Sequence, residues 1–138
     1  MTTIKAAFTL EHYLFDQVYI NLENYNKNDY GIEFNPSGKF DKKNNVFTLN
    51  FGFNATCEGQ INSFVTINCV GIYKFNEAVT ELEDIPPYFY RNAIAILFPF
   101  LRGFLSMVTI QANVPPILLP TMNLTSLEKP LLENTIEE

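Results

Sequence analysis

The chain is 138 residues long, with 47% hydrophobic residues, 14% aromatic residues that are all Phe or Tyr, and a formal net charge of −6. A chain of this length is expected to form a single domain, residues 1–138, which buries roughly two thirds of its unfolded surface. The acidic balance argues against nucleic acid as a partner, because phosphate contacts require clustered basic side chains.

Apolar residues recur at alternate positions from Ala6 to Leu22, which predicts one long strand. The alternation lapses around His12 and Asp16, where we expect a bulge or a bend. This strand is the first of a sheet that we place in residues 1–75.

Residues 23–45 lose this periodicity and are rich in Asn, Asp, Lys, Gly and Pro, which predicts a long crossover loop. Long loops in a compact domain are uncommon unless they are functional. The loop carries several aromatic side chains: Tyr25, Tyr30, Phe34 and Phe40. We therefore expect it to dock as a cover or as the wall of a binding site.

Strict alternation from Val46 to Cys57 predicts a further strand, and residues 62–75 predict its antiparallel partner after a turn at residues 58–60. In such a hairpin Cys57 and Cys69 lie on the order of 20 Å apart along the ladder, too far for a disulfide bond. Unpaired cysteines fit a reducing, cytoplasmic location.

The C-terminal half is expected to begin with a main helix, residues 85–113, that opens at adjacent prolines. A second pair of prolines forbids helix in residues 114–122, which form an extended, Pro-rich connector. A short amphipathic helix is predicted at residues 123–132, and a frayed tail at residues 133–138.

The main helix is too apolar for the surface of a monomer. Sixteen of the twenty-three residues from Tyr88 to Ile110 are apolar, so the helix has to be covered on more than one side. Membrane insertion is not expected, because Pro99 interrupts the helix and Arg102 near mid-span costs about 2.5–3.5 kcal/mol. One apolar flank can pack on the sheet, and the other predicts contact with a second subunit.

Motifs of catalysis and cofactor binding are missing from the sequence. His12 is the only histidine, and there is no Gly-rich phosphate loop, nucleophile elbow, CxxC pair or HExxH helix. Glu81 and Asp84 are close in sequence, but they lie in an acidic linker, which favours solvated side chains. We therefore expect no enzyme activity, no cofactor and no metal site.

The segment ILFPFLRGFLSMVTIQANVPPILLPTMNL, residues 96–124, resembles the SecB protein-export chaperones. Their main helix carries an apolar residue, Phe or Tyr, Pro, an aromatic residue and Arg, then Ser-Met-Val and a Pro-rich segment that ends in Asn. The matching residues here are Leu97, Phe98, Pro99, Phe100, Arg102, Ser106, Met107, Val108, Leu119, Pro120 and Asn123. The expected order of elements matches this family over nearly the whole chain.

The resemblance implies an α+β fold, in which a four-stranded antiparallel sheet is backed by a long helix and a short C-terminal helix, assembled as a dimer of dimers. It also implies an ATP-independent chaperone that binds unfolded client proteins in aromatic grooves, for protein export or for a dedicated partner. We place client binding at Tyr25, Tyr30, Phe34, Phe40, Ile117, Leu119, Leu124 and Leu127. We place the oligomer interface at Tyr90, Ile94, Leu101, Arg102 and Leu105.

Two alternatives stay open at this point. SecB-like chaperones that protect an antitoxin share the helix motif, and a small carrier of apolar ligands such as lipids would line a closed cavity with the same aromatic residues. SecB proteins that dock on the SecA motor present acids on the outer sheet face, whereas Phe64, Thr66 and Asn68 offer none here. Docking to SecA is therefore not expected. Gly103 also stands where the family often has an acid after the arginine.

Overall fold

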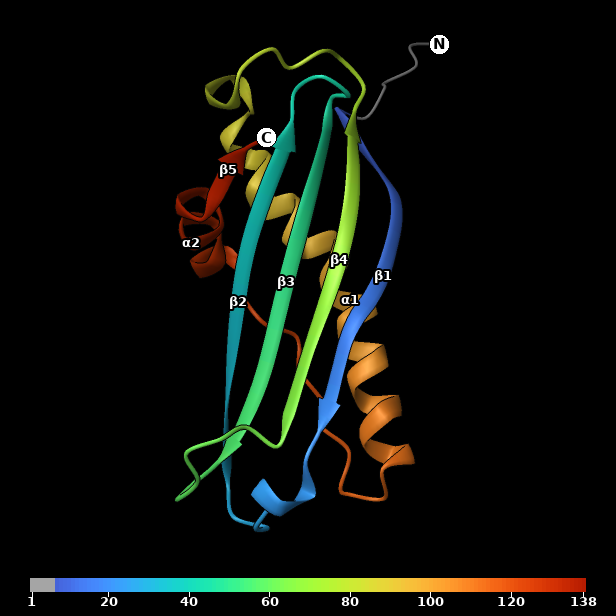
Figure 1. The fold of residues 1–138 in the computed structure, drawn as a ribbon, viewed down its shortest axis with the longest axis vertical. Helices are drawn as coiled ribbons and strands as arrows, with labels where there is room; N and C mark the ends of the chain where they lie inside the picture. Colours follow the sequence, from blue (N-terminus) through green and yellow to red (C-terminus); the bar gives the residue numbers. More distant parts are fainter. Residues whose placement is uncertain (1–6) are drawn as a thin grey trace.

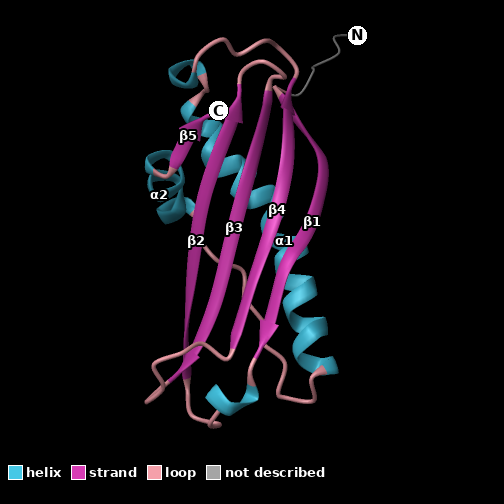
Figure 2. Cartoon of the chain, viewed as in Figure 1, coloured by secondary structure: helices cyan, strands magenta, loops and turns pink. Residues whose placement is uncertain are grey.

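The computed structural model describes residues 7–138, which form one sheet with a long helix lying obliquely across one of its faces (Figures 1 and 2). The elements are β1 (Phe8–Ile20), the 3-10 turn η1 (Leu22–Asn24), β2 (Tyr30–Asp41), β3 (Val46–Cys57), β4 (Val65–Phe75), the 3-10 turn η2 (Leu82–Asp84), α1 (Pro87–Gln111), the 3-10 turn η3 (Thr125–Leu127), α2 (Glu128–Glu133) and β5 (Thr135–Glu137). The predicted α+β class, with its long helix and short C-terminal helix, is confirmed.

The sheet has five strands in the order β1-β4-β3-β2-β5, one more than predicted. The first four pair antiparallel, whereas β5 runs parallel to β2. β5 covers only Gly38–Phe40 of β2, so the rest of β2 is a sheet edge as well. The other edge is β1.

β1 changes its alternation twice along its length. Register shifts occur on either side of the segment His12–Phe15. Each shift leaves one extra residue in a bulge, Glu11 in the first and Asp16 in the second. Because one inserted residue moves every following side chain to the opposite face, the two bulges together restore the original alternation. The lapse predicted around His12 and Asp16 is confirmed.

The predicted crossover loop, residues 23–45, is wrong over most of its length because it contains β2. The whole of Tyr30–Asp41 pairs with β3 residue by residue, and the crossover is only residues 21–29. Pro36 and Gly38 interrupt the alternation of apolar residues on the inner face, and both residue types are depleted in strands. Pro36 is tolerated because it costs no hydrogen bond between β2 and β3. A backbone N–H at this position would point away from β3, toward the open edge of β2.

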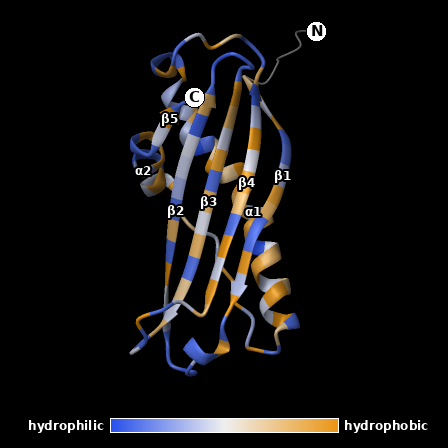
Figure 3. Cartoon of the chain, viewed as in Figure 1, coloured by the Kyte–Doolittle hydropathy of each residue, from blue (hydrophilic) through white to orange (hydrophobic). Residues whose placement is uncertain are grey.

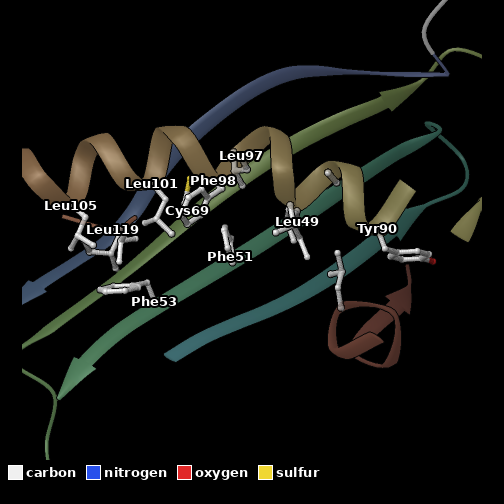
Figure 4. Close-up of a cluster of buried hydrophobic side chains, with 14 of the residues drawn as sticks. Leu49, Phe51, Phe53, Cys69, Tyr90, Leu97, Phe98, Leu101, Leu105 and Leu119 are labelled. Carbon is white, nitrogen blue, oxygen red and sulfur yellow. The ribbon is translucent and has the colours of Figure 1, made fainter. Parts of the chain in front are cut away.

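The core lies between the sheet and α1. On β3 the buried residues alternate with Thr, Asn and Gly on the outer face, and Figure 3 shows the resulting bands of hydrophobic and hydrophilic colour along the strands. Leu101 and Leu105 of α1 point toward Phe51 and Phe53 of β3 (Figure 4), and Leu97 lies over Gly71 of β4. The buried residues of α1 are Phe89, Tyr90, Ala93, Ile94, Leu97, Phe98, Leu101, Leu105 and Thr109.

Aromatic rings fill the core where α1 begins. The ring centroid of Phe89 lies 4.8 Å from those of Phe8 and Phe47 and 4.9 Å from that of Phe75. The Tyr73 hydroxyl donates a hydrogen bond of 2.6 Å to the carbonyl oxygen of Ala93. Burial raises the pKa of Tyr73 far above its usual value, so this hydroxyl stays a donor at any physiological pH.

The Pro-rich connector is fixed to the end of α1 by one buried hydroxyl. The side chain of Thr109 donates to the carbonyl oxygen of Leu105 at 2.8 Å and accepts from the backbone N–H of Ile117 at 3.0 Å. Ser106 adds a hydrogen bond of 3.2 Å to the carbonyl oxygen of Ile117. These bonds hold the connector on the helix side of the sheet, along which it returns to α2 (Figure 1).

The C-terminal tail is a strand, so the prediction that residues 133–138 fray is wrong. Thr135 is buried, and its hydroxyl donates to the carbonyl oxygen of Leu131 at 2.6 Å. The Lys42 ammonium lies 3.0 Å from the Glu137 carboxylate. β5 forms because it pairs with residues of β2 that are distant in sequence. The local sequence of a polar tail does not predict such a pairing.

Candidate functional site

Three aromatic rings, those of Tyr25, Tyr30 and Phe64, meet beside the crossover from β1 to β2. This crossover lies at the lower end of the sheet in Figure 1. The ring centroid of Phe64 lies 5.2 Å from that of Tyr25 and 5.8 Å from that of Tyr30. With Pro115 and Pro116 of the connector they line an open hollow of about 700 Å³, to which Lys27, Asn28 and Asp29 add a polar rim. We call this hollow the aromatic groove. It brings together two of the predicted client-binding residues.

Asparagine side chains hold the wall of the aromatic groove in place. Asn24 donates from Nδ2 to the carbonyl oxygen of Ser63 at 3.1 Å, and Asn26 donates to that of Glu58 at 2.9 Å. The backbone N–H of Glu58 donates in turn to the carbonyl oxygen of Asp29 at 2.8 Å. The crossover between β1 and β2 is therefore tied to the turn between β3 and β4, and Tyr25 and Tyr30 are positioned by these bonds.

Three of the predicted client-binding residues belong to the core instead. Phe40, Ile117 and Leu119 are buried, so none of them presents a surface to a client. Phe40 lies on the inner face of β2 with its ring 5.8 Å from that of Phe75. Ile117 and Leu119 are buried, and the Thr109 hydroxyl holds the connector against α1 at Ile117.

The remaining predicted client-binding residues, Phe34, Leu124 and Leu127, are half-buried against the core and lie outside the aromatic groove. The ring of Phe34 packs 5.4 Å from Phe51 and 6.1 Å from Phe98. The structure thus places only Tyr25 and Tyr30 of the predicted client-binding residues in the aromatic groove and leaves Phe34, Leu124 and Leu127 packed against the core.

Phe64 was missed as a functional residue because the alternation of its strand assigned it to the outer sheet face. It precedes β4, is fully buried, and its ring lies beneath Tyr25 and Tyr30. Its N–H donates to the carbonyl oxygen of Ala55 at 3.0 Å. Because Phe64 lies just before the strand, the alternation of β4 does not determine which way its side chain points. This position was the signal in the sequence that could have identified it.

Four of the five residues assigned to the oligomer interface are corrected by the structure. Tyr90, Ile94, Leu101 and Leu105 are buried between α1 and the sheet of the same chain, so they have no surface left for a second subunit. Arg102 is half-buried, and its guanidinium lies 5.8 Å from the ring centroid of Phe98. This geometry is that of a cation–π contact.

An apolar surface remains open on the opposite flank of α1 and on β1. The ring of Tyr13 stacks on that of Phe100 at 4.2 Å, and Phe15 stacks on Phe104 at 4.0 Å. The exposed apolar residues of this surface, which we call the β1–α1 face, are Tyr13, Val18, Ile96, Phe100, Met107 and Ile110. The double bulge directs Tyr13 toward α1, which a regular alternation does not predict.

The described residues offer little nucleophilic or metal-binding chemistry. Within residues 7–138, no group of three or more His, Cys, Asp or Glu side chains could hold a metal ion. Cys57 and Cys69 are buried free thiols, and burial together with nearby Asp16 raises the pKa of Cys69 to about 12. Its thiol is therefore protonated at neutral pH and unreactive.

By length and composition α1, Pro87–Gln111, is the one helix of the described chain that could cross a membrane. Its inner side is packed on the sheet, with nine residues buried there. The central helix of a domain core meets the same length and composition criteria, so this feature alone does not place α1 in a membrane.

No family model matches the chain. The uncharacterized protein MJ0357 of Methanocaldococcus jannaschii is 34% identical over 71 residues, which cover 48% of this chain and 46% of that protein. The match thus spans about half the length of this relative.

Solved structures give a broader likeness. The SecB-like chaperone Rv1957 of Mycobacterium tuberculosis, in complex with a ChAD peptide from the antitoxin Rv1956 HigA1, superimposes with a TM-score of 0.70 at 15% identity, covering 85% of this chain and 88% of that one. A protein of unknown function from Streptococcus agalactiae reaches a TM-score of 0.35 at 17% identity, which is too low to show a shared fold. The superposition on Rv1957 confirms that this chain has the fold of the SecB-like chaperones.

Proposed function

We propose that the protein is an ATP-independent chaperone that holds extended apolar segments of unfolded proteins. The observation that carries this proposal is the aromatic groove, in which the half-buried ring of Tyr25 and the exposed ring of Tyr30 lie over buried Phe64 and are framed by Pro115 and Pro116. The SecB-like fold and the antitoxin peptide bound to Rv1957 support it. The groove offers apolar surface and a few polar groups, which suffices for binding without catalysis.

Binding of this kind is driven by apolar burial. Each apolar side chain of a client gains about 25 cal/mol per Å² removed from water, so a few contacts on the two Tyr rings and the prolines hold a segment reversibly. Aromatic rings accept many partners because their contacts depend weakly on side-chain identity. No nucleotide is needed, since the groove captures and releases a client by mass action.

We propose a dedicated client in the cytoplasm, with no delivery to SecA. The outer faces of β3 and β4 carry Thr, Asn, Gly, Val, Ile and Lys at the positions that alternate with the core, and no carboxylate. An acidic docking surface is therefore missing from the centre of the sheet. The antitoxin peptide seen on the neighbouring structure makes a toxin–antitoxin partner the first client class to test.

We expect the variant Tyr30→Ser to lose most of its ability to suppress the aggregation of an unfolded test protein. Tyr30 is 42% exposed and contributes ring surface to the aromatic groove, so serine removes client contacts and little core packing. The measurement is light scattering of a heat-denatured test protein at increasing chaperone concentration. Tyr88→Ser is the matched control, since Tyr88 is also 42% exposed but lies outside the groove. Equal protection by both variants would remove the aromatic groove from the proposal.

We further propose that a second copy of the chain covers the β1–α1 face, which gives a dimer or a dimer of dimers. The double variant Phe100→Lys/Met107→Lys should then be folded but monomeric, because these side chains are 39% and 52% exposed and each lysine would place a charge in the interface. Light scattering distinguishes the 15.8 kDa monomer from larger species. The control is Leu132→Lys on α2, where the side chain is 51% exposed outside this face. A monomeric wild type, or a double variant that stays oligomeric, would contradict the placement.

A further inference from the structure

The outer edge of β2 is already a site of strand pairing in its upper part. The backbone N–H of Gly38 donates to the carbonyl oxygen of Asn134 at 3.1 Å, and the N–H of Glu138 donates to that of Phe40 at 2.8 Å. These bonds belong to the parallel pairing of β5 with Gly38–Phe40. The edge is therefore shaped to accept an extended chain.

Below this point the same edge continues without a neighbouring strand. Within residues 7–138, no strand pairs with Tyr30–Ser37 on the side away from β3. Figure 1 shows α2 and β5 beside the upper half of β2 and no helix or strand beside its lower half. Bonding directions alternate along a strand, so Ile32 and Phe34 direct their backbone N–H and C=O groups outward, as Gly38 does.

We propose that an extended segment of the client adds to this open edge as a further strand, in line with β5. This proposal rests on the proposed chaperone function and specifies how the client is held. The occupant is an unfolded polypeptide of roughly seven residues, which spans about 23 Å at 3.3 Å per residue. The continuity with β5 is the argument, because the outward N–H and C=O groups of Ile32 and Phe34 continue the row that Gly38 and Phe40 offer to β5. Pro36 interrupts this row and presents only its C=O group.

The side chains next to the open edge define the pattern of the occupant. Ile32 and Phe34 are half-buried on the inner face, next to the core, whereas Glu33 and Asn35 are exposed on the outer face. A strand added here therefore places alternate side chains beside Ile32 and Phe34, where apolar residues gain burial. The others face water beside Glu33 and Asn35. Backbone pairing explains how such a site accepts many sequences with one alternating pattern.

Backbone methylation of a peptide tests this pairing directly. The probe is a fluorescent seven-residue peptide of alternating Leu and Ser, made in two forms that carry N-methyl groups on either the odd or the even residues. In an added strand only one set of N–H groups faces β2, so we expect one form to lose about tenfold or more in affinity and the other to change less than about twofold. Equal affinity of the two forms, with the parent peptide still bound, would overturn strand addition and leave the aromatic groove in place.

A pair of protein variants tests the same edge from the other side. Ile32→Pro removes the outward N–H of β2, whereas Ile32→Ala keeps it and removes most of the side chain, so the proline variant should bind the parent peptide more weakly. If the proline variant does not fold, the methylated peptides alone decide. Loss of the oligomer in Ile32→Pro would assign the edge to a second copy of the chain and overturn the proposal. If neither the parent peptide nor an unfolded protein binds the wild type, the proposed function itself fails.

Discussion

Phe89→Ala should lower the free energy of unfolding by about 3–5 kcal/mol, the range for removing a buried Phe side chain. Phe89 is fully buried, and its ring lies 4.8 Å from Phe8 and Phe47, 4.9 Å from Phe75 and 5.7 Å from Tyr73, measured between centroids. Alanine therefore removes the contacts with these four rings of the sheet and leaves a cavity that they can fill only in part.

Denaturation in urea at a fixed protein concentration measures this loss, since any oligomer makes stability depend on concentration. Tyr88→Ala is the matched control, because it removes a neighbouring aromatic ring of α1 that is exposed. We expect the control to lose less than about 1 kcal/mol, as surface substitutions do. A comparable loss in the two variants would contradict the packing of α1 on the sheet.

Gly38→Ala should lower the free energy of unfolding by about 1–3 kcal/mol through overpacking. A methyl group at this position would lie 2.3 Å from Cζ of Phe47 and 2.8 Å from Oγ1 of Thr135. Phe47 is fully buried in the core, so its ring has little room to move. The substitution therefore strains the core and pushes β5 away from β2 at the same time.

Gly31→Ala in the same strand is the control, because a methyl group there meets nothing within 4 Å. Replacing glycine with alanine in an open, extended position should be neutral or stabilising by about 0.4–1 kcal/mol. Hydrogen exchange of the backbone amides of Gly38 and Glu138 reports on β5 separately, since both donate in the β2–β5 pairing. Unchanged stability and unchanged exchange in Gly38→Ala would show that the tail is not packed on β2.

The elements with a strong local pattern could be predicted from the sequence. The strict alternation of β3 and the two lapses in β1 follow from side chains that face either the core or water, and both were predicted. Prolines fixed the start of α1 and the connector that follows it. β2 was missed, because Pro36 and Gly38 are poor strand residues whose cost is offset only by pairing with β3 and β5.

The candidate site could be predicted only in part, for two physical reasons. The periodicity of α1 shows that more than one side is apolar, but it does not tell which side the chain's own sheet covers. The residues assigned to an interface, such as Leu101 and Leu105, therefore belong to the core. The aromatic groove depends on contacts between segments distant in sequence, and Tyr25, Phe64 and Pro115 meet only because the asparagine side chains tie two turns together.

A carrier of small apolar ligands is the rival account of the same aromatic residues. A carrier requires an enclosed apolar cavity, and the crossover loop that would have served as its lid is largely the strand β2. The aromatic groove is open to solvent and has a polar rim of Lys27, Asn28 and Asp29. These features favour a long occupant that passes over the surface, as an unfolded chain does.

The binding of a permanently unfolded protein, compared with its native form, tests the central claim most directly. A fluorescently labelled test protein, unfolded by reduction and alkylation of its disulfides, is titrated with the purified protein, and its anisotropy is followed with and without ATP. We expect saturable binding of the unfolded form at about micromolar concentration or below, no binding of the native form, and no effect of ATP. A protein that binds neither form, or that purifies with a lipid and exchanges it for free fatty acid, would contradict the chaperone account.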